Sequence, residues 1–292
     1  MNFSRQRKIY LELSKVRISF LVALSTASGF IVQRAALTLD VLMPTLAVFI
    51  LASGSSALNH LQEKKPDSLM ERTRHRPVPS GSISQTNALV FAISMVISGI
   101  FLLYKFSLII PLVLSILNVF WYNAVYTPLK MKTPYAVLPG ALIGAMPPAI
   151  GWTAAGGSLF DPFLLALASF FFIWQIPHFW LLLLSLGNQY SMAGYPTLTD
   201  RFSDQKIARF AFSFMVLSAI SCIAIPFFNP ESSLFLYFSL ILFSLWLLWS
   251  NRKLLRYKKK DHLLRNAFMK INLYVLFVMV ALTIDRIFNF HL

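Results

Sequence analysis

The chain has 292 residues, of which 57% are hydrophobic and only 13% are charged. Because soluble domains carry roughly a quarter charged residues, this composition excludes an ordinary soluble protein and indicates an integral membrane protein. The net charge is +15, but the cations lie between apolar runs, and no nucleic-acid-binding motif is present. The single Cys222 lies within an apolar run, which excludes a disulfide framework and a cysteine metal site.

The apolar segments predict an all-α, polytopic membrane bundle of about nine transmembrane helices. The predicted spans lie near residues 17–35, 40–60, 86–104, 107–125, 136–155, 163–185, 208–227, 233–250 and 271–289. The segment before the first span is too polar and too long for a cleavable signal peptide, so we expect that helix to be retained. One membrane domain is expected to cover residues 1–292, with polar loops near 61–85, 126–135, 186–207 and 251–270.

Lys and Arg are concentrated in the N-terminal segment and in the even-numbered connections, most densely in the eighth. The odd-numbered connections carry little beyond Arg34 and Lys105. By the positive-inside rule, the N-terminus and the even connections are cytoplasmic and the C-terminus lies outside. We therefore expect a multi-pass protein of the cell (inner) membrane that meets anionic lipids or anionic substrates on its cytoplasmic side.

A charged segment at residues 59–81 separates the second and third apolar runs. Asn59, Glu63 and Asp67 stand four residues apart, which places their side chains along one face of a helix. The neighbouring cations are Lys64, Lys65, Arg72, Arg74 and Arg76. Carboxylates beside so many donors suit a metal-bound polyphosphate. An ordinary basic loop that obeys the positive-inside rule explains the same spacing, so both interpretations stay open here.

The same segment continues with Arg72 and Thr73, then Arg76 and Pro77. Functionally, the two guanidinium groups would hold diphosphate oxygens and Thr73 would donate a hydrogen bond. The alternative is a loop that ends at a helix-stopping proline.

The fourth connection carries Tyr122, Tyr126 and Lys130 at the membrane edge. Each phenol alone is typical of an interfacial aromatic belt. Lys130 is the stronger functional candidate, as a point charge for phosphate.

The fifth span contains Gly140 and Gly144, whose GxxxG spacing favours a close helix contact. The Pro147-Pro148 pair is expected to break that helix and could shape a cavity wall. In the sixth span, Gln175 and His178 lie within an apolar segment. Polar groups at this depth indicate function, such as contact with a polar substrate group. An interhelical hydrogen bond explains them equally well.

Together these residues resemble the UbiA-type intramembrane prenyltransferase superfamily and, within it, the protoheme IX farnesyltransferase (haem O synthase) branch. The first matching motif is Asn59-x3-Glu63-x3-Asp67-x2-Met70-x-Arg72-Thr73-x2-Arg76-Pro77, whose Met-x-Arg-Thr-x-x-Arg-Pro extension is specific to the haem branch. Further matches are Tyr126-Thr127-x-Leu129-Lys130, Gly140-x3-Gly144-x2-Pro147-Pro148, Trp174-Gln175-x-Pro177-His178-Phe179-Trp180 and, near the start, Lys15-x-Arg17.

The resemblance implies nine helices around a central cavity that opens laterally to lipid. It implies transfer of a farnesyl group from farnesyl diphosphate to a vinyl group of protoheme IX, giving haem O and diphosphate, with Mg²⁺ as cofactor and haem as substrate. Haem A synthase or terminal oxidase assembly would be a further partner. The implied catalytic residues are Asn59, Glu63, Asp67 and Lys130, the first three as metal ligands; the implied substrate-binding residues are Arg72, Thr73, Arg76, Tyr126, Gln175, His178 (on the porphyrin side), Asn188 and Gln189.

One departure concerns the sixth connection, where the superfamily carries a second acidic motif. Here the amides Asn188 and Gln189 stand in place of carboxylates. Amide oxygens can ligate a hard cation, with lower affinity. Asp200 and Asp204 follow and could supply charge, although Asp204 is better explained as a helix cap.

Two rival functions remain. One is prenyl transfer to a quinone-type aromatic acceptor, against which the Arg-Thr-x-x-Arg-Pro run argues. The other is a non-catalytic haem- or lipid-binding assembly factor, which the amides at 188 and 189 favour slightly. A transporter fits least, because no paired interrupted helices appear in repeated halves.

Overall fold

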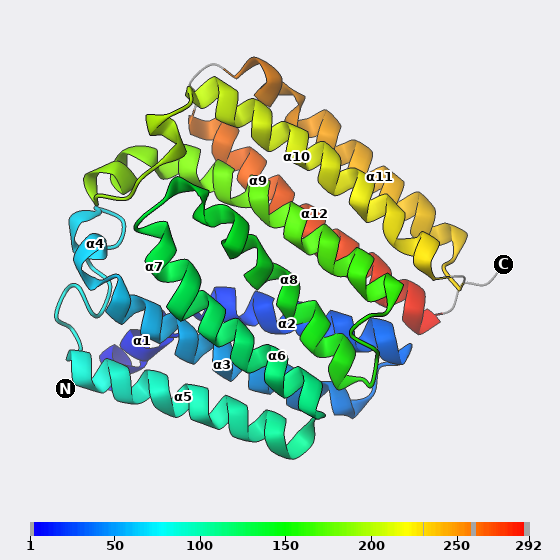
Figure 1. The fold of residues 1–292 in the computed structure, drawn as a ribbon, viewed down its shortest axis with the longest axis horizontal. Coiled ribbons are helices and arrows are strands. Elements are labelled where there is room, and N and C mark those ends of the chain that lie inside the picture. Colours follow the sequence, from blue (N-terminus) through cyan, green and yellow to red (C-terminus); the bar gives the residue numbers. More distant parts are fainter. Residues whose placement is uncertain (1–2, 230, 258–260, 289–292) are drawn as a thin grey trace.

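The computed structural model describes residues 3–229, 231–257 and 261–288. Within these ranges the chain forms helices and no strand, and nine helical segments are long and apolar enough to cross a membrane (Figure 1). These segments are Val16–Arg34, Leu39–Gln62, Gln85–Phe106, Ile109–Lys130, Pro134–Ala154, Pro162–Gly187, Asp204–Phe228, Leu234–Arg256 and His262–Phe288. The predicted all-α membrane bundle is therefore confirmed.

The longer helices build these spans, apart from α1, which precedes the first span. They are α1 (Phe3–Leu13), α2 (Val16–Arg34), α3 (Leu42–Gln62), α5 (Gln85–Phe106), α6 (Ile109–Phe120), α8 (Val137–Ala154), α9 (Pro162–Met192), α10 (Asp204–Ala224), α11 (Leu234–Asn251) and α12 (Asp261–Phe288). Short helices α4 (Lys64–Leu69) and α7 (Thr127–Lys130) lie in or beside connections, and η6 (Arg252–Arg256) follows α11. A π-helical segment, η2 (Trp121–Tyr126), joins α6 to α7.

Two predictions about the helices were wrong. Helix α8 runs unbroken through Pro147 and Pro148, because it packs tightly between α2 and α9. A Cβ added to Gly151 would lie 1.8 Å from the Thr26 carbonyl oxygen, so α2 touches the backbone of α8 here. The last span begins at His262 and not near 271, because helix α12 extends past its apolar part through a polar, basic turn.

Buried and exposed side chains divide between the bundle interior and its outer surface. A large buried cluster joins α9 to α12, with Phe170, Tyr274 and Met215 fully enclosed. Large apolar side chains such as Phe101 and Ile97 stay exposed on the outer helices, as expected for surfaces that meet lipid tails.

The polar connections meet at one end of the bundle, where Figure 1 shows α4. Three contacts link them: Lys15 with Asn59, Arg72 with Gln189, and Arg209 with Leu255. These contacts place the start of α2, the end of α3, the end of α9 and the end of α11 at the same end.

Candidate functional site

The first motif spans a break between two helices. Helix α3 ends at Gln62, and Glu63 has a non-helical backbone (φ −96°, ψ 12°) before α4 begins. The spacing predicted that the three residues share one helix, and this prediction was wrong. The Glu63 N–H nevertheless donates to the Asn59 carbonyl at 3.0 Å, and the Asp67 N–H donates to the Glu63 carbonyl at 2.8 Å. This continued four-residue hydrogen-bond pattern keeps the side chains on one face across the break.

All three side chains of the motif are buried: Asn59 is 1% exposed, Glu63 5% and Asp67 1%. Buried carboxylates are costly unless they are paired with a cation. Here Asp67 accepts from Arg76 at 2.7 Å, and Glu63 forms an ion pair with Lys130. Burial alone would raise the pKa of Glu63, but the positive charges of Lys130 and Lys15 lower the pKa below its usual value. Glu63 is therefore held as a carboxylate.

Asn59 is fixed from both sides. Its Oδ1 accepts from Lys15 Nζ at 2.7 Å, and its Nδ2 donates to Thr127 Oγ1 at 3.3 Å. Lys15 connects α1 to α2 in the left-handed conformation (φ 42°), which is strained for a residue with a side chain. Burial, together with the charge of Arg76, lowers the pKa of Lys15 to about 7. A bound anion would stabilise the protonated form of this lysine.

The π-helical segment η2 positions a second layer of polar groups under the motif. Asn123 is buried there and exchanges hydrogen bonds with Ser55 and Gln62 of α3. Thr127, one turn further, donates to the Tyr122 carbonyl at 2.8 Å while it supports Asn59. π-Helical turns are frequent at functional sites, and this one fixes the register of α3 against α6 and α7.

The motif has the composition of a site for a hard divalent cation. One oxygen of Asp67, Oδ1, is buried and makes no hydrogen bond with the described residues. Together with Glu63 and the Asn59 amide, it offers the oxygen ligands that Mg²⁺ prefers. No group of three His, Cys, Asp or Glu side chains gathers anywhere in residues 3–229, 231–257 and 261–288, so two carboxylates would need substrate phosphates and water to complete a cation's coordination.

Arg72, Thr73 and Gln189 form a link between the two polar segments. Thr73 is fully buried and donates to the Asp67 carbonyl at 2.9 Å, so it supports the motif. The Arg72 backbone N–H donates to Gln189 Oε1 at 3.3 Å, which leaves the exposed Arg72 guanidinium outside this contact. Gln189 lies on α9, which continues to Met192, so the sixth connection begins later than predicted. The side chain of Asn188 lies outside the described part of the structure.

The two later acids have structural contacts. Asp200 is exposed and accepts from the Thr197 backbone N–H at 2.8 Å. Asp204 is the first residue of α10, where a negative charge complements the helix dipole, and the cap itself is Ser203. Asp204 is thus not the cap that the sequence predicted, and Ser203 holds the cap position without a side-chain capping hydrogen bond.

Aromatic rings and two glycines form the wall next to Lys130. Lys130 Nζ lies 5.5 Å from the ring centre of Tyr126, which in turn contacts Phe179. A Cβ on Gly140 would lie 2.6 Å from Tyr126, and one on Gly144 would lie 2.5 Å from Gln175 Oε1. The GxxxG pair therefore admits side chains of predicted site residues, and not a neighbouring helix backbone.

His178 lies on the same helix as Gln175 and is held by α12. Its Nδ1 lies 2.9 Å from Asn272 Oδ1, and its ring packs against Trp174 and Phe268. Asn272 is itself fixed by a hydrogen bond from its amide to the Phe268 carbonyl at 2.6 Å. The predicted interhelical hydrogen bond is present, and it leaves Nε2 as the outward nitrogen.

Sequence reasoning missed several residues of this site. Asn272 belongs to no motif that we recognised, because its partner His178 is distant in sequence. The partners of Asn123 are likewise distant in sequence and were not foreseen. Thr127 was noted only as part of a motif, although it holds Asn59. Tyr195, 6% exposed and 5.8 Å from Lys130 by its ring centre, carried a signal in the Ala-Gly-Tyr-Pro sequence.

The fold and the motif define a class: a multi-pass helical membrane protein with buried, charge-paired carboxylates at one end of its bundle. The chain belongs to the UbiA prenyltransferase family, whose model matches residues 19–274. Among its relatives, the protoheme IX farnesyltransferase of Geobacter sulfurreducens is 40% identical over 65% of this chain and 70% of that protein. That of Opitutus terrae is 30% identical over 96% and 95%.

Solved structures agree on the fold. Digeranylgeranylglyceryl phosphate synthase aligns with a TM-score of 0.77 at 17% identity, over 96% of this chain and 98% of that one. A UbiA homolog from Archaeoglobus fulgidus, bound to DMAPP and Mg²⁺, aligns with a TM-score of 0.69 at 14% identity, over 94% and 99%.

Proposed function

We propose that this chain transfers a farnesyl group from farnesyl diphosphate to a vinyl group of protoheme IX, giving haem O and diphosphate. The acceptor is supported by the relatives named protoheme IX farnesyltransferase. The donor is supported by one observation above others: two buried carboxylates, each paired with a cation, follow the buried Asn59 at the polar end of the bundle.

Asn59, Glu63 and Asp67 would hold Mg²⁺, since they offer hard oxygen ligands and Asp67 Oδ1 has no partner in the described structure. When bound, the cation would neutralise charge on the diphosphate leaving group. The homolog from Archaeoglobus fulgidus, whose structure contains DMAPP and Mg²⁺, makes a divalent cation consistent with the family.

The cations of the site would bind the diphosphate. Arg76 and Lys130 now contact Asp67 and Glu63, and they would turn part of their hydrogen bonding to phosphate oxygens when the substrate arrives. The exposed Arg72 guanidinium extends the cationic side of the site. Once turned to the bound diphosphate, these charges would be in place before the bond breaks and would stabilise the departing group.

The transfer itself breaks the bond between C1 of the farnesyl chain and the diphosphate oxygen, which keeps the electron pair. The allylic cation then accepts the electrons of the haem vinyl group, and water adds to the resulting cation and loses a proton. Tyr126, beside Lys130, and Phe179, tilted against Tyr126, would shield the allylic cation from water and stabilise it with their ring faces.

His178 would face the porphyrin. With Nδ1 engaged by Asn272, its other nitrogen is directed away from that contact and can meet the haem iron or a polar substrate group. Gln175, which occupies the space left by Gly144, would line the same side.

We further propose that residues 1–292 form one prenyltransferase unit in the cell inner membrane, with a cytoplasmic N-terminus and an external C-terminus. The gathering of the basic, even-numbered connections at one end supports this orientation. Haem A synthase or terminal oxidase assembly would take up the product.

The test is haem extraction and mass analysis from a haem O synthase-deficient bacterium that expresses this chain. Hydroxyethylfarnesyl haem is the expected product. If none forms although the protein is present in the membrane, the proposal is wrong, and assays with quinone precursors would then separate another acceptor from a binding-only role.

A further inference from the structure

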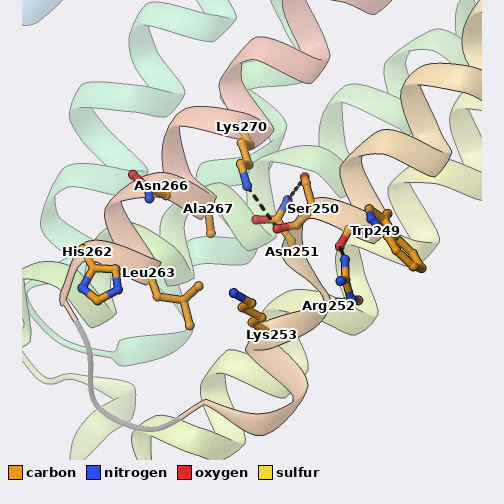
Figure 2. A pocket seen from close by; sticks show the side chains of 10 residues that line it. All are labelled: Trp249, Ser250, Asn251, Arg252, Lys253, His262, Leu263, Asn266, Ala267 and Lys270. Atoms are coloured by element: carbon orange, nitrogen blue, oxygen red, sulfur yellow. Dashed lines mark hydrogen bonds between the residues drawn. The ribbon is translucent and has the colours of Figure 1, made fainter.

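A second polar pocket lies away from the acidic motif, between the end of α11 and the start of α12 (Figure 2). Its volume is about 370 Å³, at the lower end of the roughly 300–1,000 Å³ typical of ligand pockets. Nothing in the proposed prenyl transfer uses it. It lies at the same end of the bundle as the motif, because Arg209 at the start of α10 contacts Leu255 just after α11.

The pocket is strongly cationic. Arg252, Lys253 and Lys270 line it together with His262, and no carboxylate is among its lining residues. Figure 2 shows Lys253 of η6 and Lys270 of α12 reaching toward the space between these elements. Lys270 Nζ donates to the Ser250 carbonyl at 3.0 Å, and none of these cations forms an ion pair with another described residue. Cations gathered without a counter-charge among the described residues favour an anionic ligand.

Trp249 indicates the depth of this pocket in the bilayer. Its ring is 69% exposed, and the Arg252 guanidinium lies 3.8 Å above the ring centre while donating to the Trp249 carbonyl at 2.8 Å. Exposed tryptophans with a cation above them are typical of the level of lipid headgroups. The pocket therefore lies beside phospholipid phosphates.

An exposed apolar stripe leads from the pocket toward the bilayer centre. Phe238, Leu242, Leu245 and Trp249 follow one another at spacings of four, three and four residues, which places them on one face of α11. Their exposures are 70%, 64%, 62% and 69%. An acyl chain can lie along this stripe while its headgroup occupies the pocket.

We propose that the pocket binds the phosphodiester of an anionic phospholipid, with Lys253 and Lys270 as the phosphate-binding residues. The lipid, and not a soluble phosphate, is the occupant that uses both the cationic pocket and the apolar stripe below it. An anionic leaflet attracts basic groups at this level, which adds to the local recognition.

The test is native mass spectrometry of the full chain in detergent, titrated with phosphatidylglycerol or with phosphatidylcholine of the same acyl chains. Lys253→Gln/Lys270→Gln should bind phosphatidylglycerol roughly tenfold more weakly and phosphatidylcholine unchanged, because each lysine near a lipid phosphate contributes appreciably. The matched control, Lys105→Gln/Lys206→Gln, removes two positive charges elsewhere and should bind like the parent chain. Lys253→Gln alone, which breaks no described contact, should show a smaller loss in the same direction.

Three outcomes would overturn the proposal. The first is equal phosphatidylglycerol binding by the parent chain and the double variant, and the second is an equal loss in the control. The third is displacement of the lipid by millimolar inorganic phosphate, which would identify a site for soluble anions. If the double variant binds lipid normally but needs roughly tenfold more protoheme for half-maximal transfer, the pocket serves haem propionates instead.

Discussion

Two polar segments meet at the same end of this bundle, residues 59–76 and 187–204, and they use their acids in opposite ways. In the first, Glu63 and Asp67 are buried and each is paired with a cation. In the second, Asp200 is exposed and binds a backbone N–H of its own turn. The first segment holds charged groups inside the protein, whereas in the second segment Asp200 stabilises a local turn.

The difference indicates that the two segments have different roles. Burying an ion pair costs several kcal/mol of desolvation per ion, so paired buried carboxylates are weak evidence for stability and good evidence for a binding site. Gln189 is neutral, and the one described hydrogen bond of its side chain is with the Arg72 backbone N–H. We infer that the first segment supplies the charges of the reaction and that the second holds the first in place.

Asp67→Asn is the change that should break this comparison most strongly. It keeps the shape of the side chain but removes the negative charge opposite Arg76, so haem O yield should fall by at least roughly 100-fold. Haem extraction and mass analysis, with membrane levels of the protein as reference, measure this. Asp200→Asn makes the same chemical change in the second segment and should stay within roughly twofold of the parent chain. Normal yield from Asp67→Asn would show that Asp67 is not a metal ligand.

Arg76→Lys should have the next largest effect. It replaces a planar fork, which can bind Asp67 and phosphate together, by a point charge. The Michaelis constant for farnesyl diphosphate should rise roughly tenfold, with a smaller change in kcat. Arg74→Lys, two residues away on an exposed position, is the matched control. An unchanged Michaelis constant would remove Arg76 from the donor site.

Local sequence patterns predicted the spans and the shared face of Asn59, Glu63 and Asp67 well, because hydrophobic length and four-residue spacing are local properties. The same patterns failed where tertiary contacts decide. Pro147 and Pro148 were expected to break a helix, but close packing of α2 and α9 on α8 outweighs the lost backbone hydrogen bond. The break at Glu63 was missed because no residue type in the sequence indicates it. The four-residue hydrogen bonds continue across this backbone irregularity.

Local sequence patterns also did not predict hydrogen-bond partners that are distant in sequence. His178 was predicted to be functional or to hydrogen-bond another helix, but its partner Asn272 is 94 residues away. Lys15 was noted only as part of a motif, and its contact with Asn59 requires a left-handed backbone that sequence spacing does not reveal. A side chain's type indicates what it can bind, whereas the fold determines which group it meets.

Asp200→Ala should separate stability from chemistry in the second segment. It removes the acceptor for the Thr197 N–H, which should cost about 1 kcal/mol of folding free energy, as for other lost helix caps. Thermal unfolding in detergent measures the loss, and yield per folded molecule should be unchanged. Asp200→Asn retains an acceptor oxygen and should recover most of the stability. A selective loss of turnover in Asp200→Ala would instead place this acid in the reaction.

Gln189→Glu should have the smallest effect and tests the different roles of the two segments most finely. The carboxylate has the same reach as the amide and remains an acceptor for the Arg72 N–H, now in a charge-assisted hydrogen bond. Haem O yield should stay within roughly twofold of the parent chain or rise, because the added charge restores an acid to the second segment without removing the contact. Gln189→Leu, which keeps the volume and loses the acceptor, should lower yield by loosening Arg72. If Gln189→Glu loses activity as severely as Gln189→Leu, a neutral side chain is required at this position. The second segment would then contribute to the charge balance of the site, in addition to holding the first segment in place.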